Sequence, residues 1–186
     1  MQSSRSGIPL IDRSGTMQHR TALISSEGRF TYKNLLDASA CASSALLGHT
    51  QDLRGARVAF LTPPSFQYVA ILWGVWRAGG LAIPLSSRDT RPELEYVIAN
   101  SGASILIAHP EFEPIIKSIA NDRLIRFELT TDLINSDVKP LPRVDMNSRA
   151  TILYTSGTTS KPKGVVATHM NIEAQVTSLV KAWEWT

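Results

Sequence analysis

One stretch of the sequence, YTSGTTSKPKGV at residues 154–165, concentrates side chains that suit anion binding. It holds five serine and threonine hydroxyls, two glycines and two lysines. Small residues after a strand let backbone N–H groups turn toward one point, and glycine lets an anion come close to them. The lysines add charge-assisted bonds, so the predicted chemistry is binding of a polyphosphate. The candidate binding residues are Thr155, Ser156, Gly157, Thr158, Thr159, Ser160, Lys161, Lys163 and Gly164.

The order of residues in this stretch differs from the two familiar nucleotide-binding loops. Counted from Gly157, the pattern G-x-x-x-x-G-K-[ST] needs glycine at its sixth position, where the sequence has Pro162. The sequence also contains no G-x-G-x-x-G, so a dinucleotide-binding Rossmann site has no support. Composition alone fits a flexible surface linker equally well, so the functional interpretation depends on the specific order of the residues.

Apolar segments alternate with amphipathic helices, which predicts an α/β fold with a mostly parallel sheet flanked by helices. A hairpin with Gly28 at its turn is expected over 21–32, followed by a helix that Thr31 caps. Later helices are expected at 65–80, 91–102 and 112–121, and from about Asn171. Strands are expected at 56–62, 81–85, 103–108, 123–129 and 150–155. The polar, proline-bearing segment 130–148 is predicted to be a surface connection.

The order YTSGTTSKPKG closely resembles the phosphate-binding signature of the adenylate-forming superfamily, which includes acyl-CoA synthetases, luciferases and peptide-synthetase adenylation domains. The stretch from LTPPSFQYVAILWGVWRAGG to NSGASILIA is similar to the family's N-terminal subdomain, and GRFTYKNLL is similar to its opening hairpin and helix. The resemblance covers nearly all of residues 20–186. One departure is Ser160, which stands where the family usually has glycine; if that site needs a positive φ, serine is strained there.

The resemblance implies that a carboxylate attacks the α-phosphorus of ATP to give an acyl-adenylate and pyrophosphate. A thiol, commonly that of coenzyme A, then displaces AMP. Residues 155–159 would cradle the β- and γ-phosphates and Lys163 would pair with them, with Mg²⁺ implied. Lys161 would be a secondary, solvent-facing charge, Pro162 would stiffen the loop, and Gly164 would allow a sharp return into VVATH.

The family's fold normally continues for several hundred residues beyond this loop. The resemblance therefore implies that residues 1–20 are an N-terminal extension and that residues 21–186 are an incomplete N-terminal domain. The adenine and acyl pockets and the catalytic residues are expected beyond residue 186, no metal ligand is assigned, and the chain alone is expected to be inactive. A short-chain acid or malonate is the guess for the substrate.

Two other functions remain open at this point. A peptide-synthetase adenylation domain would load a carrier thiol in place of coenzyme A. A non-catalytic truncated product would bind phosphate-bearing ligands or a partner, and it would expose apolar surface.

Composition and charge give little support to a nucleic-acid-binding or membrane-spanning protein. The net charge of +3 is not concentrated in a block, and no apolar run approaches the roughly 18–20 residues that span a bilayer. Cys41, the sole cysteine, excludes an internal disulfide and is interpreted as a packed thiol. The expected location is intracellular, in the cytoplasm, with a mitochondrion or plastid as the alternative. The expected partners are a carboxylic acid, ATP and CoA.

Several other side chains that could do chemistry are interpreted as structural. Trp73 and Trp76 share an apolar helix face, which indicates core packing, and Glu93 and Glu95 face different ways on their helix. Tyr154 is interpreted as a strand-end packing residue. His169 could act as a base, but with no visible partner a structural or substrate-wall role is favoured.

Overall fold

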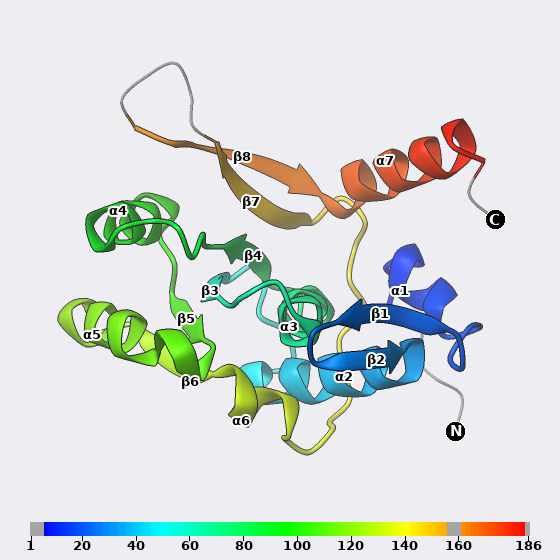
Figure 1. The fold of residues 1–186 in the computed structure, drawn as a ribbon, viewed down its shortest axis with the longest axis horizontal. Helices are drawn as coiled ribbons and strands as arrows, with labels where there is room; N and C mark the ends of the chain where they lie inside the picture. The colour runs from blue at the N-terminus through cyan, green and yellow to red at the C-terminus, as the bar shows by residue number, and fades with distance from the viewer. Residues whose placement is uncertain (1–5, 156–160, 185–186) are drawn as a thin grey trace.

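The computed structural model describes residues 6–155 and 161–184. Within these residues, six strands form one sheet in the order β6-β5-β3-β4-β7-β8, and β1 and β2 form a separate hairpin (Figure 1). Neighbouring strands of the sheet are parallel except β7 and β8, which are antiparallel. The predicted α/β fold with a mostly parallel sheet is confirmed. The strands are β1 (Thr21–Ser25), β2 (Gly28–Thr31), β3 (Arg57–Leu61), β4 (Leu81–Pro84), β5 (Ile105–Ala108), β6 (Arg126–Leu129), β7 (Arg149–Thr155) and β8 (Lys163–Thr168).

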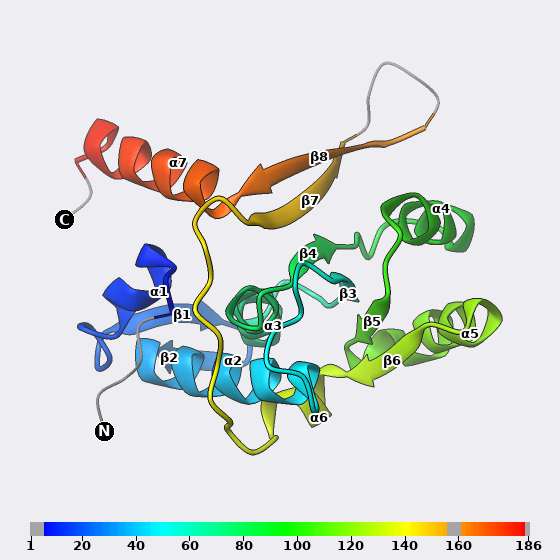
Figure 2. The same ribbon diagram turned by 180° about the vertical axis from the view of Figure 1, so that it is seen from behind.

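Helices cover both faces of the sheet. Helices α2 and α3 lie on one side and α4 and α5 on the other, as Figures 1 and 2 show from opposite directions. The helices are α1 (Pro9–Ser14), α2 (Tyr32–Leu47), α3 (Phe66–Arg77), α4 (Arg91–Ser101), α5 (Glu113–Arg123), α6 (Thr130–Ile134) and α7 (His169–Ala182), with a 3-10 turn η1 (Pro110–Phe112).

The alternation of side chains along each inner strand divides the core into two layers. In β3, Val58 and Phe60 pack under α2 and α3, whereas Ala59 and Leu61 pack under α4 and α5. Ile107 and Leu106 in β5 divide in the same way. Because both faces are buried, the strands are continuously apolar from Val58 to Leu61 and from Ile105 to Ala108, which is the pattern from which a parallel sheet was predicted.

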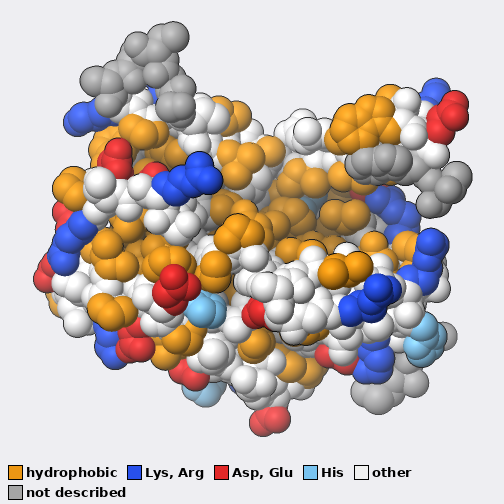
Figure 3. All heavy atoms as spheres, in the orientation of Figure 1, with side chains coloured by type: hydrophobic (Ala, Val, Ile, Leu, Met, Phe, Trp, Pro, Cys, Tyr) orange, Lys and Arg blue, Asp and Glu red, His pale blue; other side chains and the backbone are white. Residues whose placement is uncertain are grey.

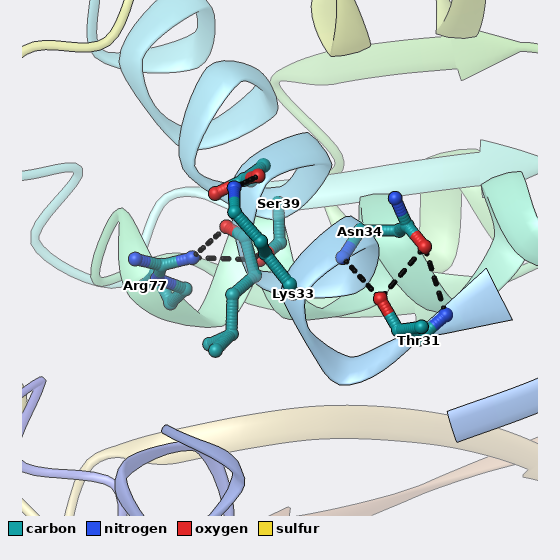
Figure 4. Close-up of polar contacts among 7 residues, drawn as sticks. Thr31, Lys33, Asn34, Ser39 and Arg77 are labelled. Atoms are coloured by element: carbon teal, nitrogen blue, oxygen red, sulfur yellow. Dashed lines mark hydrogen bonds and ion pairs between the residues drawn. The ribbon is translucent and has the colours of Figure 1, made fainter. Parts of the chain in front are cut away.

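Helices α2 and α3 are held together by close packing and by one partly buried arginine. Gly74 allows the approach, because a Cβ there would lie 2.8 Å from the Cβ of Ala42. The Arg77 guanidinium donates to the Leu36 carbonyl at 2.6 Å and to Ser39 Oγ at 2.7 Å (Figure 4). The same figure shows the predicted cap of α2, in which the Thr31 hydroxyl accepts from the backbone N–H of Asn34.

One expectation about local structure was wrong. The segment 130–148 is not merely a surface connection, because α6 forms in it and Leu133 and Val144 are buried in the core. The final helix begins at His169, close to the expected start near Asn171, since Thr168 makes the capping box. The expected first hairpin forms, and Gly28 pairs with Ser25 across its turn.

The N-terminal residues contain a helix that the sequence analysis did not expect. Pro9 and Gly15 mark the two ends of α1. Proline suits the first turn of a helix because its missing N–H would be unbonded there anyway. Ile8 and Ile11 are buried against the main core, so this segment packs on the sheet-and-helix body.

Hairpin β7–β8 and helix α7 carry exposed apolar side chains. Leu153, Val165 and Val166 are half exposed or more, at 50%, 56% and 50%, and Met170 follows on α7 at 49%. Figure 3 shows hydrophobic atoms gathered on the face that includes this part of the molecule. Among the described residues, no helix is long and apolar enough to span a membrane.

Candidate functional site

The candidate site lies where β7 and β8 close the predicted polar loop. The two strands pair in antiparallel register, with Thr155 opposite Lys163 and Tyr154 opposite Gly164. This register brings the two ends of the loop side by side. Thr155 and Lys163 are therefore neighbours across the two strands. Figure 1 shows this hairpin projecting beyond the rest of the sheet.

The structure places the predicted site residues in three groups. Thr155 ends β7 and is exposed, and Lys163 and Gly164 begin β8, also exposed. The exposed Lys161 precedes β8, and its ammonium lies 5.3 Å from the centre of the Tyr96 ring. The remaining residues lie outside the described part of the chain: Ser156, Gly157, Thr158, Thr159 and Ser160.

Gly164 has a different local role from the one expected. It lies inside β8 and not at a sharp return of the chain. A Cβ at this position would lie 2.8 Å from Ile152 Cγ2 and 3.2 Å from Cζ of Tyr154. Glycine is therefore needed because two side chains of β7 cross over its backbone.

The base of the hairpin is fixed to the core by three contacts. β7 is registered with β4 at Ala82 and Thr151, and the Thr151 hydroxyl donates to the Ala82 carbonyl at 3.0 Å. On the other face, the Trp76 indole N–H donates to the Ala150 carbonyl at 2.8 Å. Trp76 is thus a core residue, as predicted, and it also anchors β7.

His169 is buried beneath the end of β8. Its side chain is 3% exposed and packs edge-to-face on Trp76, with ring centres 5.5 Å apart. Burial lowers the pKa of His169 from its ordinary value of 6.5 to about 4, so the imidazole is neutral at pH 7. This environment favours the structural role over a role as a base.

Helix α4 supplies two site residues that sequence reasoning missed, Tyr96 and Asn100. The Tyr96 hydroxyl donates to the Pro162 carbonyl at 3.3 Å, and the Tyr154 hydroxyl donates to Asn100 Oδ1 at 2.7 Å. The only sequence signal was their spacing of four, which puts both on one helix face. Burial raises the pKa of Tyr154 above its ordinary value.

A cavity of about 340 Å³ lies between α4, the end of β4 and the hairpin. Tyr154 and Pro162 line it on the hairpin side, and Asp89 and Glu93 line it on the α4 side. The two carboxylates would repel a polyphosphate, so we expect the phosphates on another side of the loop. Glu93 and Glu95 act separately, as predicted, because Glu93 accepts from Thr90 and Glu95 pairs with Arg91.

A second cavity, of about 310 Å³, opens at the carboxyl ends of β3 and β4. Thr62, Tyr68 and Arg88 contribute to its lining, and Thr62 Oγ1 is buried without a hydrogen-bond partner among the described residues. Helices α3 and α4 leave these neighbouring strands toward opposite faces of the sheet. Such a switch in direction is where doubly wound sheets form ligand crevices.

The family model of AMP-binding enzymes matches residues 12–186, nearly the whole chain. The chain belongs to the AMP-binding enzyme family. A human relative, the mitochondrial malonate–CoA ligase ACSF3, is 36% identical over 201 residues, which cover 100% of this chain and 34% of that protein. The malonate–CoA ligase of Arabidopsis thaliana is also 36% identical, over 72% of this chain and 24% of its own length. The chain spans about a third of the length of the curated relatives that it matches over nearly its whole length.

Solved members of the family have the same fold. ATP-bound MatB from Rhodopseudomonas palustris aligns with a TM-score of 0.83 and 27% identity, over 97% of this chain and 38% of that chain. The predicted membership of the adenylate-forming CoA ligases is therefore confirmed.

The space above Gly164 gives a stability prediction. We expect Gly164→Ala to lower the free energy of unfolding by about 1–3 kcal/mol, because the new methyl group must displace Ile152 or Tyr154. Val166→Thr is the matched control, since Val166 is half exposed on the same strand and threonine is also β-branched. The control should change stability by less than about 0.5 kcal/mol. Urea unfolding measures both variants, and equal stability of Gly164→Ala and the wild type would contradict the packing described.

The buried imidazole gives a pH prediction. The unfolded chain binds a proton at His169 below about pH 6.5, whereas the folded chain binds it only near pH 4. The contribution of neutral His169 to the free energy of unfolding should therefore be fully present above pH 6.5. It should be lost as the pH falls from about 6.5 to 4. We expect His169→Gln to flatten the fall in unfolding free energy across this window. His49→Gln, at an exposed position, is the control and should follow the wild type.

Proposed function

We propose that this chain forms the ATP phosphate-binding part of an ATP-dependent carboxylic acid–CoA ligase. The observation that carries the proposal is the β7–β8 register, which sets Thr155 opposite Lys163 at the mouth of the hydroxyl-rich loop. The family match and the CoA-ligase relatives support the same reaction. In that reaction a carboxylate oxygen bonds to the α-phosphorus as pyrophosphate leaves, and a thiolate then bonds to the acyl carbon as AMP leaves.

Lys163 is assigned the role of pairing with the β- and γ-phosphates. Its ammonium offsets negative charge that builds on pyrophosphate as it departs, and the hydroxyl of Thr155 adds a hydrogen-bond donor beside it. The loop residues 156–160 are proposed to complete the phosphate contacts through their hydroxyls and backbone N–H groups. Mg²⁺, when bound, would neutralise phosphate charge. In the described ranges, no group of three or more His, Cys, Asp or Glu side chains could hold a metal ion. We therefore assign no metal ligand within those ranges.

We propose malonate as the acid. Four vertebrate malonate–CoA ligases match 96–100% of the chain at 32–36% identity, and the plant relative has the same activity in its name. The vertebrate proteins are named as mitochondrial, which supports a mitochondrial location for this protein.

The phosphate role is tested by binding of a fluorescent ATP analogue to the 186-residue chain. We expect Lys163→Ala to weaken binding about tenfold, since hydrogen bonds to charged groups contribute about 1.5–3 kcal/mol in protein sites. Raising the salt concentration should weaken wild-type binding more than binding by the variant. The control is Lys181→Ala, which removes the same charge in the last turn of α7, away from the hairpin. This variant should bind the analogue normally. Equal losses in both variants would show a nonspecific effect of charge.

The acid is tested by ATP–pyrophosphate exchange in the full polypeptide that carries these residues. Malonate should stimulate exchange more strongly than acetate, methylmalonate or benzoate, and Lys163→Ala should reduce the malonate-dependent rate. Exchange with another acid alone would overturn malonate but keep the ligase. An absence of exchange with every acid, together with no ATP binding, would remove the proposed function itself.

A further inference from the structure

The two ends of the candidate loop are both bonded to a single helix, α4. Tyr154, one residue before Thr155, donates to Asn100 Oδ1 at 2.7 Å. Pro162, one residue before Lys163, accepts from the Tyr96 hydroxyl at 3.3 Å. One bond thus holds the β7 side of the hairpin and the other holds the β8 side.

Helix α4 is a firm support because its other face belongs to the core. Leu94, Val97 and Ile98 are 1–3% exposed and pack under the sheet. Its first turn is closed by the capping box of Thr90 and Glu93. Tyr96 and Asn100, one turn apart, project toward the hairpin from this fixed helix, and Figure 1 shows α4 beneath the hairpin's outer half.

The hairpin needs such a support because the sheet does not reach its tip. β7 is registered with β4 only at Ala82 and Thr151, four residues before Thr155, and β8 is the edge strand. Beyond that point the two strands pair with each other alone. An isolated two-stranded hairpin is marginally stable in water, so its direction depends on contacts other than its own ladder.

Tyr96 makes a second contact at the same end. The Lys161 ammonium lies 5.3 Å from the centre of its ring, within the range of a cation–π interaction. The hydroxyl of Tyr96 and its ring therefore hold neighbouring residues, Pro162 and Lys161, through different chemistry. A phenylalanine would keep the ring contact and lose only the hydrogen bond.

We propose that Tyr96 and Asn100 form a clamp that sets the direction of the β7–β8 hairpin and so positions Lys163 for the phosphates of ATP. Tyr96 and Asn100 are assigned as positioning residues, because each contacts the hairpin. The effect on ATP rests on the proposed function, whereas the clamping of the hairpin does not. Displacements of about 1 Å in a positioned group can cost a hundredfold in rate, so a small change in hairpin direction is enough to be measured.

The clamp is tested first without ATP, by amide hydrogen exchange of residues 163–166. We expect Tyr96→Phe to speed this exchange about threefold or more, and the double variant Tyr96→Phe with Tyr154→Phe to speed it further. Tyr32→Phe, on α2, is the matched control and should leave these amides unchanged. Unchanged exchange in the double variant would overturn the clamp, whatever the chain binds.

The second measurement is ATP affinity at a temperature where every variant is fully folded. Tyr96→Phe should weaken binding about threefold, and Tyr96→Leu, which also removes the ring under Lys161, about tenfold or more. A merely structural residue would lower the melting temperature and leave the affinity of the folded chain unchanged, which would contradict the positioning role. If the wild type itself binds no ATP, the effect of the clamp on ATP is overturned, while the hydrogen-exchange result still decides the clamping of the hairpin.

Discussion

The burial of both faces of the central sheet is the constraint on which the rest of the structure depends. Side chains of β3 and β5 alternate between the layer under α2 and α3 and the layer under α4 and α5, and both layers are closed to solvent. The inner strands β3 and β5, covered in this way, cannot present a binding surface on either face. Ligand-binding groups must therefore lie at the ends of the strands, and the carboxyl ends of β3, β4 and β7 share one edge because these strands are parallel.

The β7–β8 hairpin extends past the strand that supports it, because β7 is registered with β4 only at Ala82 and Thr151. In the proposed function, the loop between the two strands binds phosphate through backbone N–H groups and hydroxyls, which cannot then be bonded in a strand ladder. Side chains hold the described part of the hairpin: Trp76 and Thr151 at its base, and Tyr96 and Asn100 at the two ends of the loop. Tyr154 makes contacts within the hairpin and outside it, since it packs over Gly164 and its hydroxyl also donates to Asn100 of α4.

The sequence was sufficient for what depends on local pattern. Apolar runs separated by helical periodicity predicted the strands and most helices, since both the alternation and the cap at Thr31 depend on neighbouring residues. The predictions failed where contacts between residues far apart in the sequence determine the structure. Segment 130–148 is polar, yet Leu133 and Val144 are buried because α2, α3 and the N-terminal residues lie over them. Tyr96 and Pro162 are 66 positions apart, and no periodicity relates them.

The same contrast between local patterns and long-range contacts applies to single residues of the candidate site. The loop was recognisable because its chemistry is contiguous in sequence. The function of Gly164 was misjudged because glycine in a sequence indicates turns more readily than it indicates a strand crossed by large side chains from its partner. The burial of His169 was also not visible, since its partner Trp76 lies on another element, almost a hundred positions earlier.

The surroundings of the two lysines argue for different roles. Lys161 has its ammonium over the Tyr96 ring, so moving it to a phosphate would cost that contact. Lys163 is in the β8 ladder directly opposite Thr155, so its backbone position follows from the same register that closes the loop. A charge whose backbone is fixed beside the loop loses less conformational entropy on meeting a phosphate than one that must first leave another partner. These surroundings support the proposed assignment of Lys163 to the phosphates, and they place Lys161 against α4.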